Sequence, residues 1–173
     1  MNRVVFSSAR MDWRTPADVY DELNREFCFD FDPCPPDPGF DGLAVPWGDA
    51  SFVNPPYGRE LPKWVAKAHR EAALGKTVVM LIPSRTDTRW WHDHVMAAHE
   101  IRYIKGRLRF HGARHGAPFP SCLVIWRGGT SRPEGRPVLT PIPAEVPPPP
   151  GRAEPGHPLR ERPATPAAGR GAL

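Results

Sequence analysis

Cysteine is scarce in this sequence of 173 residues, and long apolar runs are missing. The three cysteines, Cys28, Cys34 and Cys122, cannot form a fully paired disulfide framework, and they lack the two close pairs that favour a four-ligand zinc site. No apolar run approaches the roughly 18 residues that a membrane span needs, and the N-terminus lacks the apolar core of a secretion signal. We therefore expect a cytoplasmic protein with no membrane contact and no metal.

Aromatic residues are absent beyond Trp126, where proline and glycine dominate. Residues 131–173 hold 12 of the 24 prolines together with five glycines, a share above the roughly 25–30% that is typical of low-complexity disorder. The length suits one domain. We predict a flexible N-terminus over residues 1–10, a folded domain over 11–128 and a disordered tail rich in proline, glycine and arginine over 129–173.

Acidic residues are absent between Ile101 and Pro133, where seven basic residues lie. In contrast, the segment from Asp12 to Glu60 has 11 acidic residues and three basic ones. This asymmetry predicts a polyanionic partner for one side of the molecule. A basic face that is merely exposed to solvent is the alternative interpretation.

Apolar spacing and turn residues predict alternating helices and strands. The first helix is expected to begin with Thr15 as its N-cap and Pro16 at its first position, because both residues favour a helix start there. Further helices are expected over residues 62–74 and 87–98. The expected strands cover residues 27–31, 50–53, 77–82, 101–105 with an extended continuation over 106–110, and 121–126. This alternation predicts an α/β fold with a largely parallel sheet.

In a parallel sheet, the loops after the strands lie together at the carboxyl edge, which is where ligands bind. One of these loops carries an acid, one carries an amide and an aromatic ring, and two carry cations. They are residues 32–34, 54–57, 83–85 and 105–107. We expect a functional site where these four loops meet.

The tetrapeptide Asn54–Tyr57, Asn-Pro-Pro-Tyr, directly follows a short apolar strand. A turn stiffened by proline is the simplest interpretation, but the position after a strand favours a functional turn. The tetrapeptide is similar to the catalytic motif of S-adenosylmethionine-dependent amino-methyltransferases. Other motifs accompany it, in the order Trp13–Pro16, Phe29–Cys34, Asp41–Leu43 with Trp47, Leu81–Thr88 and Gly106–Phe110. Together, over residues 11–127, they resemble the phage-encoded DNA N-6-adenine methyltransferase (Dam-like) family.

The resemblance implies a Rossmann-like S-adenosylmethionine-dependent methyltransferase core, encoded by a phage or prophage, that methylates the exocyclic amine of adenine in double-stranded DNA. The side-chain oxygen of Asn54 and the carbonyl of Pro55 would each accept an amino hydrogen, which directs the nitrogen lone pair toward the methyl group. Pro55 and Pro56 would hold these acceptors rigidly. Tyr57 would stack on the adenine after it has left the DNA helix.

The resemblance also implies that Thr15, Pro16 and Asp32 approach the methionine end of S-adenosylmethionine. Asp49, shortly before the Asn54 turn, is a further candidate for bonding a hydroxyl or amine of the cofactor. A glycine-rich run after the first strand is absent, because the chain reads Asp-Pro-Cys-Pro-Pro from Asp32 onward. Capping of a helix or turn is the alternative role for Asp32.

The candidates for DNA contact are basic residues on the loops after strands, namely Arg85, Lys105, Arg107, Arg109 and Arg114. Arginine and lysine neutralise phosphate irrespective of base sequence, and alternation along an extended backbone would put Arg107 and Arg109 on one face. Two other functions stay open: methylation of a different amino group, such as that of cytosine or of a glutamine amide, and nucleic-acid binding without catalysis. The sequence predicts no oligomeric state.

Overall fold

The computed structural model describes residues 14–110, 113–129 and 137–143. The helical elements are α1 (Ala17–Phe27), α2 (Leu61–Ala73), α3 (Arg89–His94) and the short 3₁₀ helix η1 (Val95–Ala97). The strands are β1 (Ala50–Val53), β2 (Thr77–Pro83), β3 (Glu100–Lys105), β4 (Ser121–Trp126) and β5 (Val138–Pro143). Within the described ranges, no helix combines the length and the apolarity that crossing a membrane requires.

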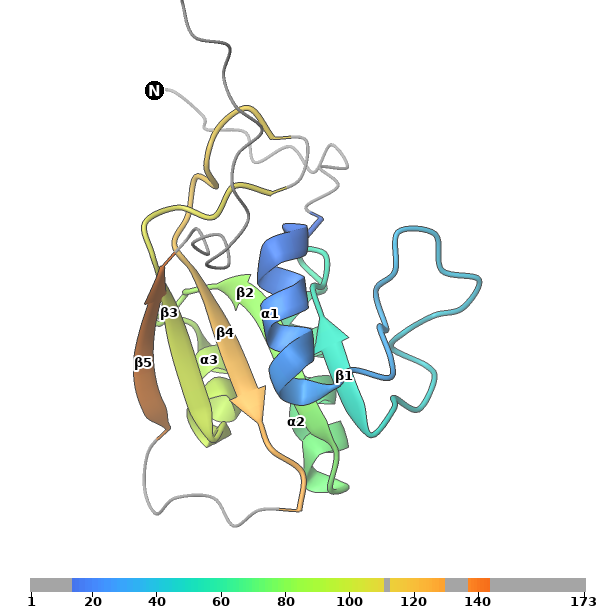
Figure 1. The fold of residues 1–173 in the computed structure, drawn as a ribbon. Coiled ribbons are helices and arrows are strands. Elements are labelled where there is room, and N and C mark those ends of the chain that lie inside the picture. Colours follow the sequence, from blue (N-terminus) through green and yellow to red (C-terminus); the bar gives the residue numbers. More distant parts are fainter. Residues whose placement is uncertain (1–13, 111–112, 130–136, 144–173) are drawn as a thin grey trace, which may run out of the picture.

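The five strands form one sheet in the order β1-β2-β4-β3-β5 (Figure 1). β1 pairs in parallel with β2, and β3 with β5, whereas β4 runs antiparallel to both of its neighbours. The α/β class is therefore confirmed. Four of the five strands run in one direction, as expected for a largely parallel sheet, and the reversed β4 makes the sheet mixed. The reason lies in the loop from β3 to β4, whose described residues form no crossover helix, so the chain returns beside β3 in the opposite direction.

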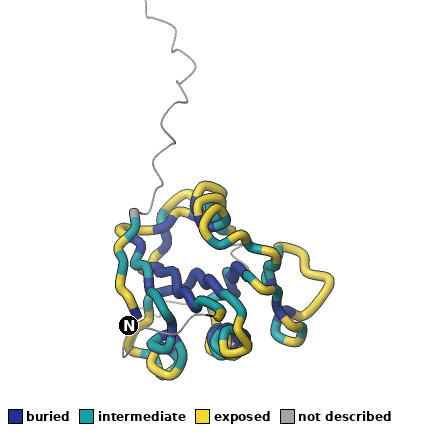
Figure 2. Tube along the Cα trace, turned by 60° about the horizontal axis from the view of Figure 1, so that its bottom comes forward, coloured by how far each residue is buried: buried dark blue, intermediate teal, exposed yellow. Residues whose placement is uncertain are grey.

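Helices cover both faces of the sheet, and its central strands form the buried middle layer (Figure 2). α1 packs on one face through Val19 and Leu23, together with Leu108 and Phe110 from the loop after β3. α2, α3 and η1 pack on the other face. All of β4 is buried, as is β2 from Val78 onward, which agrees with the continuous apolar runs that predict strands covered on both sides.

The helix over 62–74 is confirmed to within one residue at each end, whereas α1 and α3 begin differently from the sequence expectation. Pro16, and not Thr15, occupies the N-cap position of α1, and no side chain caps that helix. The helix expected over 87–98 begins later, at Arg89, and tightens into η1 in its last turn. A helix this short is marginal by itself, and burial of Trp91 in the core holds it in place.

The strand expected over residues 27–31 is reduced to a single bridge between Phe31 and Ser51. α1 continues through Phe27, and Cys28 then takes a left-handed φ of 51° that redirects the chain. The segment that follows still runs beside β1. The loop after it is therefore brought to the same edge as the end of β1.

β5 lies within the segment expected to be disordered, so that prediction is wrong for Val138–Pro143. The N–H of Val138 donates to the carbonyl of His99, and alternation along the strand turns the nitrogens of Pro141 and Pro143 toward the free edge of the sheet. The two prolines therefore interrupt no ladder bond and leave few donors for a further strand. The expected flexible N-terminus and most of the remaining tail lie outside the described residues.

Candidate active site

Four loops with polar side chains meet at one edge of the sheet. β1, β2 and β3 run in the same direction, so their carboxyl ends share an edge, and the segment that bridges to β1 ends there too. Figure 1 shows this edge at the top, where the amino end of α1 and the loop between β3 and β4 also lie. The expected meeting of residues 32–34, 54–57, 83–85 and 105–107 follows from these strand directions.

The turn Asn54–Tyr57 forms where β1 can no longer pair with β2. Pairing stops after Val53, since Pro55 has no N–H with which to extend the ladder. The Leu81 carbonyl instead accepts a hydrogen bond from the Tyr57 hydroxyl at 3.2 Å. The prolines thus end the strand, and the turn brings Tyr57 back over the strand end.

The side chain of Asn54 is held on both sides. Its Nδ2 donates to Oγ1 of Thr15 at 3.1 Å, and its Oδ1 accepts from the Tyr57 hydroxyl at 2.8 Å. Asn54 and Thr15 are both half-buried. The structure therefore brings Thr15 to the predicted acceptor amide instead of to the first turn of the helix.

Tyr57 packs edge-on against two other rings, with centroid separations of 6.1 Å to Phe110 and 5.5 Å to Phe119. Burial raises the pKa of Tyr57 well above its ordinary value, so its hydroxyl stays protonated and acts as a donor. This hydroxyl has one proton and two acceptors within reach, Asn54 Oδ1 and the Leu81 carbonyl. It can therefore leave Asn54 without losing a hydrogen-bond partner.

Asp32 lies half-buried at the same edge, just after the bridge to β1. Its Oδ1 accepts the N–H of Cys34 at 2.8 Å, so Asp32 does cap a turn. Burial raises the pKa of the Asp32 carboxyl. Burial, and secondly the charge of Asp32, raises the pKa of Tyr20 as well. No cation pairs with Asp32 in the part of the chain that the structure describes.

This carboxylate suits a ligand with an ammonium or hydroxyl group. Cys34 engages one oxygen of Asp32, and the other has no hydrogen-bond partner among the described residues. Pro33 stands in place of a glycine-rich run, and the chain is tight here, since a side chain on Gly42 would collide with the Pro33 carbonyl. Ligand contact at this loop is therefore expected from a side chain and not from exposed backbone.

Asp49 is not brought to this edge. It precedes β1 whereas Asn54 follows it, and the length of the strand separates them by roughly 16 Å. The N–H of Asp49 donates to the carboxylate of Asp30 at 3.1 Å, which fixes the start of the strand. Pro16, in contrast, does lie at the carboxyl edge, at the amino end of α1.

The loop between β3 and β4 presents basic side chains to solvent. Residues 106–110 form no strand, but burial still alternates along them: Leu108 and Phe110 are buried, whereas Arg107 and Arg109 are exposed on the other side. The N–H of Ala117 donates to the Leu108 carbonyl at 2.8 Å and holds the loop against the domain. The other predicted DNA-contact residues are also exposed, namely Arg85, Lys105 and Arg114.

Two further arginines of the same basic region are used differently. Arg102 on β3 and Arg127 after β4 both contact Glu26 at the end of α1 and Glu100 on β3, at N–O distances of 2.6 to 3.2 Å. Both guanidinium groups also lie over the ring of Phe27. Hydrogen bonds from the arginines lower the pKa of both glutamates. This ion-pair network of Glu26, Glu100, Arg102 and Arg127 fastens α1 to the sheet.

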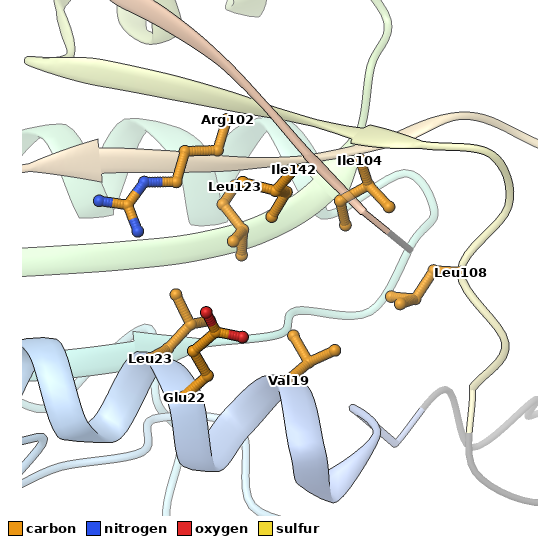
Figure 3. Close-up of a pocket in the computed structure, with 8 residues that line it drawn as sticks. All are labelled: Val19, Glu22, Leu23, Arg102, Ile104, Leu108, Leu123 and Ile142. Carbon is orange, nitrogen blue, oxygen red and sulfur yellow. The ribbon is translucent and has the colours of Figure 1, made fainter. Parts of the chain in front are cut away.

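A cavity of about 70 Å³ lies between α1 and the sheet, and the charged groups of Glu22 and Arg102 lie on one side of it (Figure 3). Its other lining residues are apolar: Val19, Leu23, Ile104, Leu108, Leu123 and Ile142. It is too small for a nucleoside-sized ligand, and no predicted catalytic residue lines it. As for metals, the described residues contain no group of three or more His, Cys, Asp or Glu side chains that could hold an ion.

Sequence reasoning missed three groups that hold Tyr57: the Leu81 carbonyl and the rings of Phe110 and Phe119. The alternation of apolar and basic residues in the loop after β3 is a signal that could have placed Phe110 in the core. Nothing in the sequence connects Thr15 with Asn54, because that contact depends on how α1 crosses the sheet.

Comparison with known proteins identifies a matching family and a curated relative. The family model described as DNA N-6-adenine-methyltransferase (Dam) matches residues 40–134. A DNA N-6-adenine-methyltransferase from Haemophilus phage HP1 (strain HP1c1) is 34% identical over 106 residues, covering 53% of this chain and 61% of the relative. The chain thus spans less than two thirds of that relative. The range of the family model includes the Asn54–Tyr57 turn and the basic loop, but begins after Thr15 and Asp32.

Proposed function

The chain belongs to the DNA N-6-adenine-methyltransferase family, and from this premise we propose that it transfers a methyl group from S-adenosylmethionine to the exocyclic amine of adenine in double-stranded DNA. The observation that carries the proposal is the amide of Asn54, held by Thr15 and Tyr57 at the carboxyl edge of the sheet. Exposed basic residues lie at the same edge. An acceptor for an amine and a surface for phosphate therefore adjoin each other.

Asn54 Oδ1 and the Pro55 carbonyl act as acceptors for the two amino hydrogens of adenine. The amine is a poor nucleophile because its lone pair is delocalised into the ring, and two fixed acceptors favour the geometry in which the lone pair points at the methyl group. S-adenosylmethionine would supply that methyl group in an activated form, bonded to a sulfonium. As the N–CH₃ bond forms, the S–CH₃ bond would break, S-adenosylhomocysteine would leave, and the methylated nitrogen would release one proton to water. The protein then contributes alignment of the two reactants more than acid–base chemistry.

The Tyr57 hydroxyl occupies Asn54 Oδ1 and must leave it before adenine can bind. The Leu81 carbonyl, 3.2 Å from the same hydroxyl, offers the replacement acceptor. Adenine reaches Asn54 only as a base turned out of the duplex, and the hydrogen bond from the Tyr57 hydroxyl to Asn54 Oδ1 places an aromatic ring beside the amide. We therefore propose that Tyr57 changes its hydrogen-bond partner as the base enters.

Asp32 is the residue that we propose for binding the cofactor. Its raised pKa reflects a carboxylate that is partly removed from water without a counter-ion in the described residues. A cationic group of the cofactor would supply that counter-ion. Binding through this side chain is compatible with a Rossmann-like arrangement that lacks the glycine-rich run, and Pro16 lies at the same edge.

DNA would contact the loop that holds Tyr57 in place. Arg107 and Arg109 project from the side of the loop opposite Phe110. The same loop would therefore bind phosphate on one side while Phe110 contacts Tyr57 on the other. Basic side chains bind phosphate irrespective of base sequence. Lys105 at the end of β3, Arg85 after β2 and Arg114 in the loop between β3 and β4 are exposed as well.

The test is methyl transfer from labelled S-adenosylmethionine to unmethylated DNA, followed by mass spectrometry of the nucleosides. Wild type is compared with Asn54→Leu, which keeps the shape and removes the acceptor, and with Asn54→Asp, which keeps an acceptor. We expect N6-methyldeoxyadenosine from wild type, a loss of about a hundredfold or more in Asn54→Leu, and substantial activity in Asn54→Asp.

Other products would redirect the proposal. Methylated deoxycytidine would keep the site and change the base that it accepts. Folded wild-type protein that binds DNA but forms no methylated product would support nucleic-acid binding without catalysis. Activity in Asn54→Leu equal to that of wild type would show that another group accepts the amine.

A further inference from the structure

Thr15 is free of the helix-capping role that its position suggests. The N-cap of α1 is Pro16, with φ −55° and ψ 138°, and no side chain caps the helix. A residue that precedes proline is restricted to extended backbone, and a β-branched side chain has few rotamers at χ1. The local chain therefore fixes the direction of the Thr15 hydroxyl.

That hydroxyl is directed at the side chain of Asn54. Oγ1 of Thr15 accepts from Nδ2 of Asn54 at 3.1 Å, across 39 positions of sequence. Oδ1 on the other side of the amide accepts from Tyr57. If an adenine amine takes the place of the Tyr57 hydroxyl, Thr15 Oγ1 stays in place as an acceptor for Nδ2.

We propose that Thr15 is a positioning residue for methyl transfer, which holds the Asn54 amide in the orientation that turns Oδ1 toward the reacting amine. This inference rests on the function proposed above. It gives Thr15 a different role from the one that the family resemblance implies, because Thr15 acts through Asn54 and not on the cofactor. Displacement of an acceptor slows the chemical step without weakening the binding of either reactant.

The test compares Thr15→Val, which keeps the shape and removes the hydroxyl, with Thr15→Ser, which keeps the hydroxyl. Methyl transfer is measured with labelled S-adenosylmethionine and unmethylated DNA, each varied to saturation, and cofactor affinity is measured by equilibrium dialysis. We expect kcat of Thr15→Val to fall about tenfold, while KM for DNA and Kd for the cofactor stay within about twofold of wild type. Thr15→Ser should recover most of the wild-type kcat.

Two outcomes overturn the inference. An unchanged kcat in Thr15→Val shows that Asn54 needs no support from Thr15. A weaker affinity for S-adenosylmethionine, with the rate restored at saturating cofactor, makes Thr15 a cofactor-binding residue instead. Equal melting temperatures of the variants exclude a folding defect, and Thr15→Ala replaces Thr15→Val in the same comparison if the valine variant unfolds.

A second measurement needs no activity. The side-chain NH₂ signals of Asn54, identified by their loss in Asn54→Asp, are recorded by NMR in ¹⁵N-labelled protein without substrate. We expect them to shift in Thr15→Val and to stay near their wild-type positions in Thr15→Ser. Inactive wild-type protein overturns the proposed function and this inference with it. Active wild type, with unchanged signals and unchanged kcat in Thr15→Val, overturns this inference alone.

Discussion

Carboxylates in two regions of the molecule have opposite environments. In the ion-pair network, hydrogen bonds from Arg102 and Arg127 lower the pKa of Glu26 and Glu100. At the carboxyl edge, burial raises the pKa of Asp32, and no cation among the described residues compensates it. Matched charges of the first kind stabilise the fold. An unmatched charge of the second kind opposes folding, and this is a physical sign of a ligand site.

The basic residues divide in the same way. All of these cations come from the basic segment 101–133. Arg102 and Arg127 form ion pairs with glutamates. In contrast, Lys105, Arg107 and Arg109 are exposed. A run of cations in the sequence therefore overstates the surface available to DNA. What separates the two sets is the position of the acids on α1 and β3.

Among substitutions of charged residues, the largest effect is expected for Asp32→Asn, which keeps an acceptor for the Cys34 N–H and removes the charge. Affinity for S-adenosylmethionine should fall about thirtyfold, since a hydrogen bond between charged groups contributes roughly 2 kcal/mol. The melting temperature should rise, because the raised pKa means that ionised Asp32 destabilises the folded protein at neutral pH. Equilibrium dialysis and calorimetry measure the two effects.

Weaker cofactor binding together with a higher melting temperature distinguishes a ligand-binding Asp32 from a purely structural one. The gain in stability should shrink as the pH falls through the raised pKa, because wild-type Asp32 is then protonated as well. A variant that is less stable at neutral pH, or that binds the cofactor as wild type does, would remove Asp32 from the site.

A smaller effect is expected when two exposed cations of the basic loop are removed together. Arg107→Ala with Arg109→Ala should weaken binding to double-stranded DNA about tenfold at low salt and reduce the slope of log K against log salt by about two. The matched control is Arg25→Ala with Arg70→Ala, which removes equal charge from the last turns of α1 and α2. Equal losses in both double variants would mean that only net charge matters.

Removal of one charge from the network should lower stability and leave DNA binding unchanged. Glu100 and Arg102 are each 15% exposed, so Glu100→Gln is expected to cost about 1–2 kcal/mol, between the values for surface and buried pairs. Glu60→Gln breaks a pair with Lys63 whose side chains are 53% and 65% exposed, and its effect should be close to zero. Urea unfolding measures both, and equal effects would contradict the distinction between matched and surface charges.

Much of the fold could be predicted because it depends on local pattern. Continuous apolar runs predict β2 and β4 as buried strands. A proline and a glycine mark the start and the end of α2. The direction of β4 could not be predicted, since an apolar run has no polarity along the chain. β5 could not be predicted because it contains Pro141 and Pro143. Proline-rich sequence is typical of disorder, but proline is tolerated in a strand at the free edge of a sheet.

In the candidate site too, local features could be predicted from the sequence and long-range contacts could not. The turn at Asn54 and the shared exposure of Arg107 and Arg109 follow from neighbours in sequence. The contacts of Asn54 with Thr15 and of Arg102 with Glu26 join residues 39 and 76 positions apart. Such contacts exist only after packing has placed α1 against the sheet, and no local pattern specifies them.

The smallest expected effect is on the pH dependence of stability, where the two kinds of carboxylate act in opposite directions. Glu26 and Glu100 have pKa values below their ordinary value of 4.5, so their contribution is complete above that pH and is lost as the pH falls through the lowered pKa values. Asp32 has a pKa above its ordinary value of 3.8, so its ionisation lowers stability as the pH rises through that window.

The slope of unfolding free energy against pH between about 3 and 6 should therefore become shallower in Glu100→Gln and steeper in Asp32→Asn. Urea unfolding at a series of pH values measures both slopes against wild type. The unfolded chain binds more protons than the folded one at Glu100 and fewer at Asp32, which fixes the two signs independently of any other group. Slopes that change in the same direction would mean that Asp32 has a counter-ion in the folded protein. Asp32 would then stabilise the fold as Glu26 and Glu100 do.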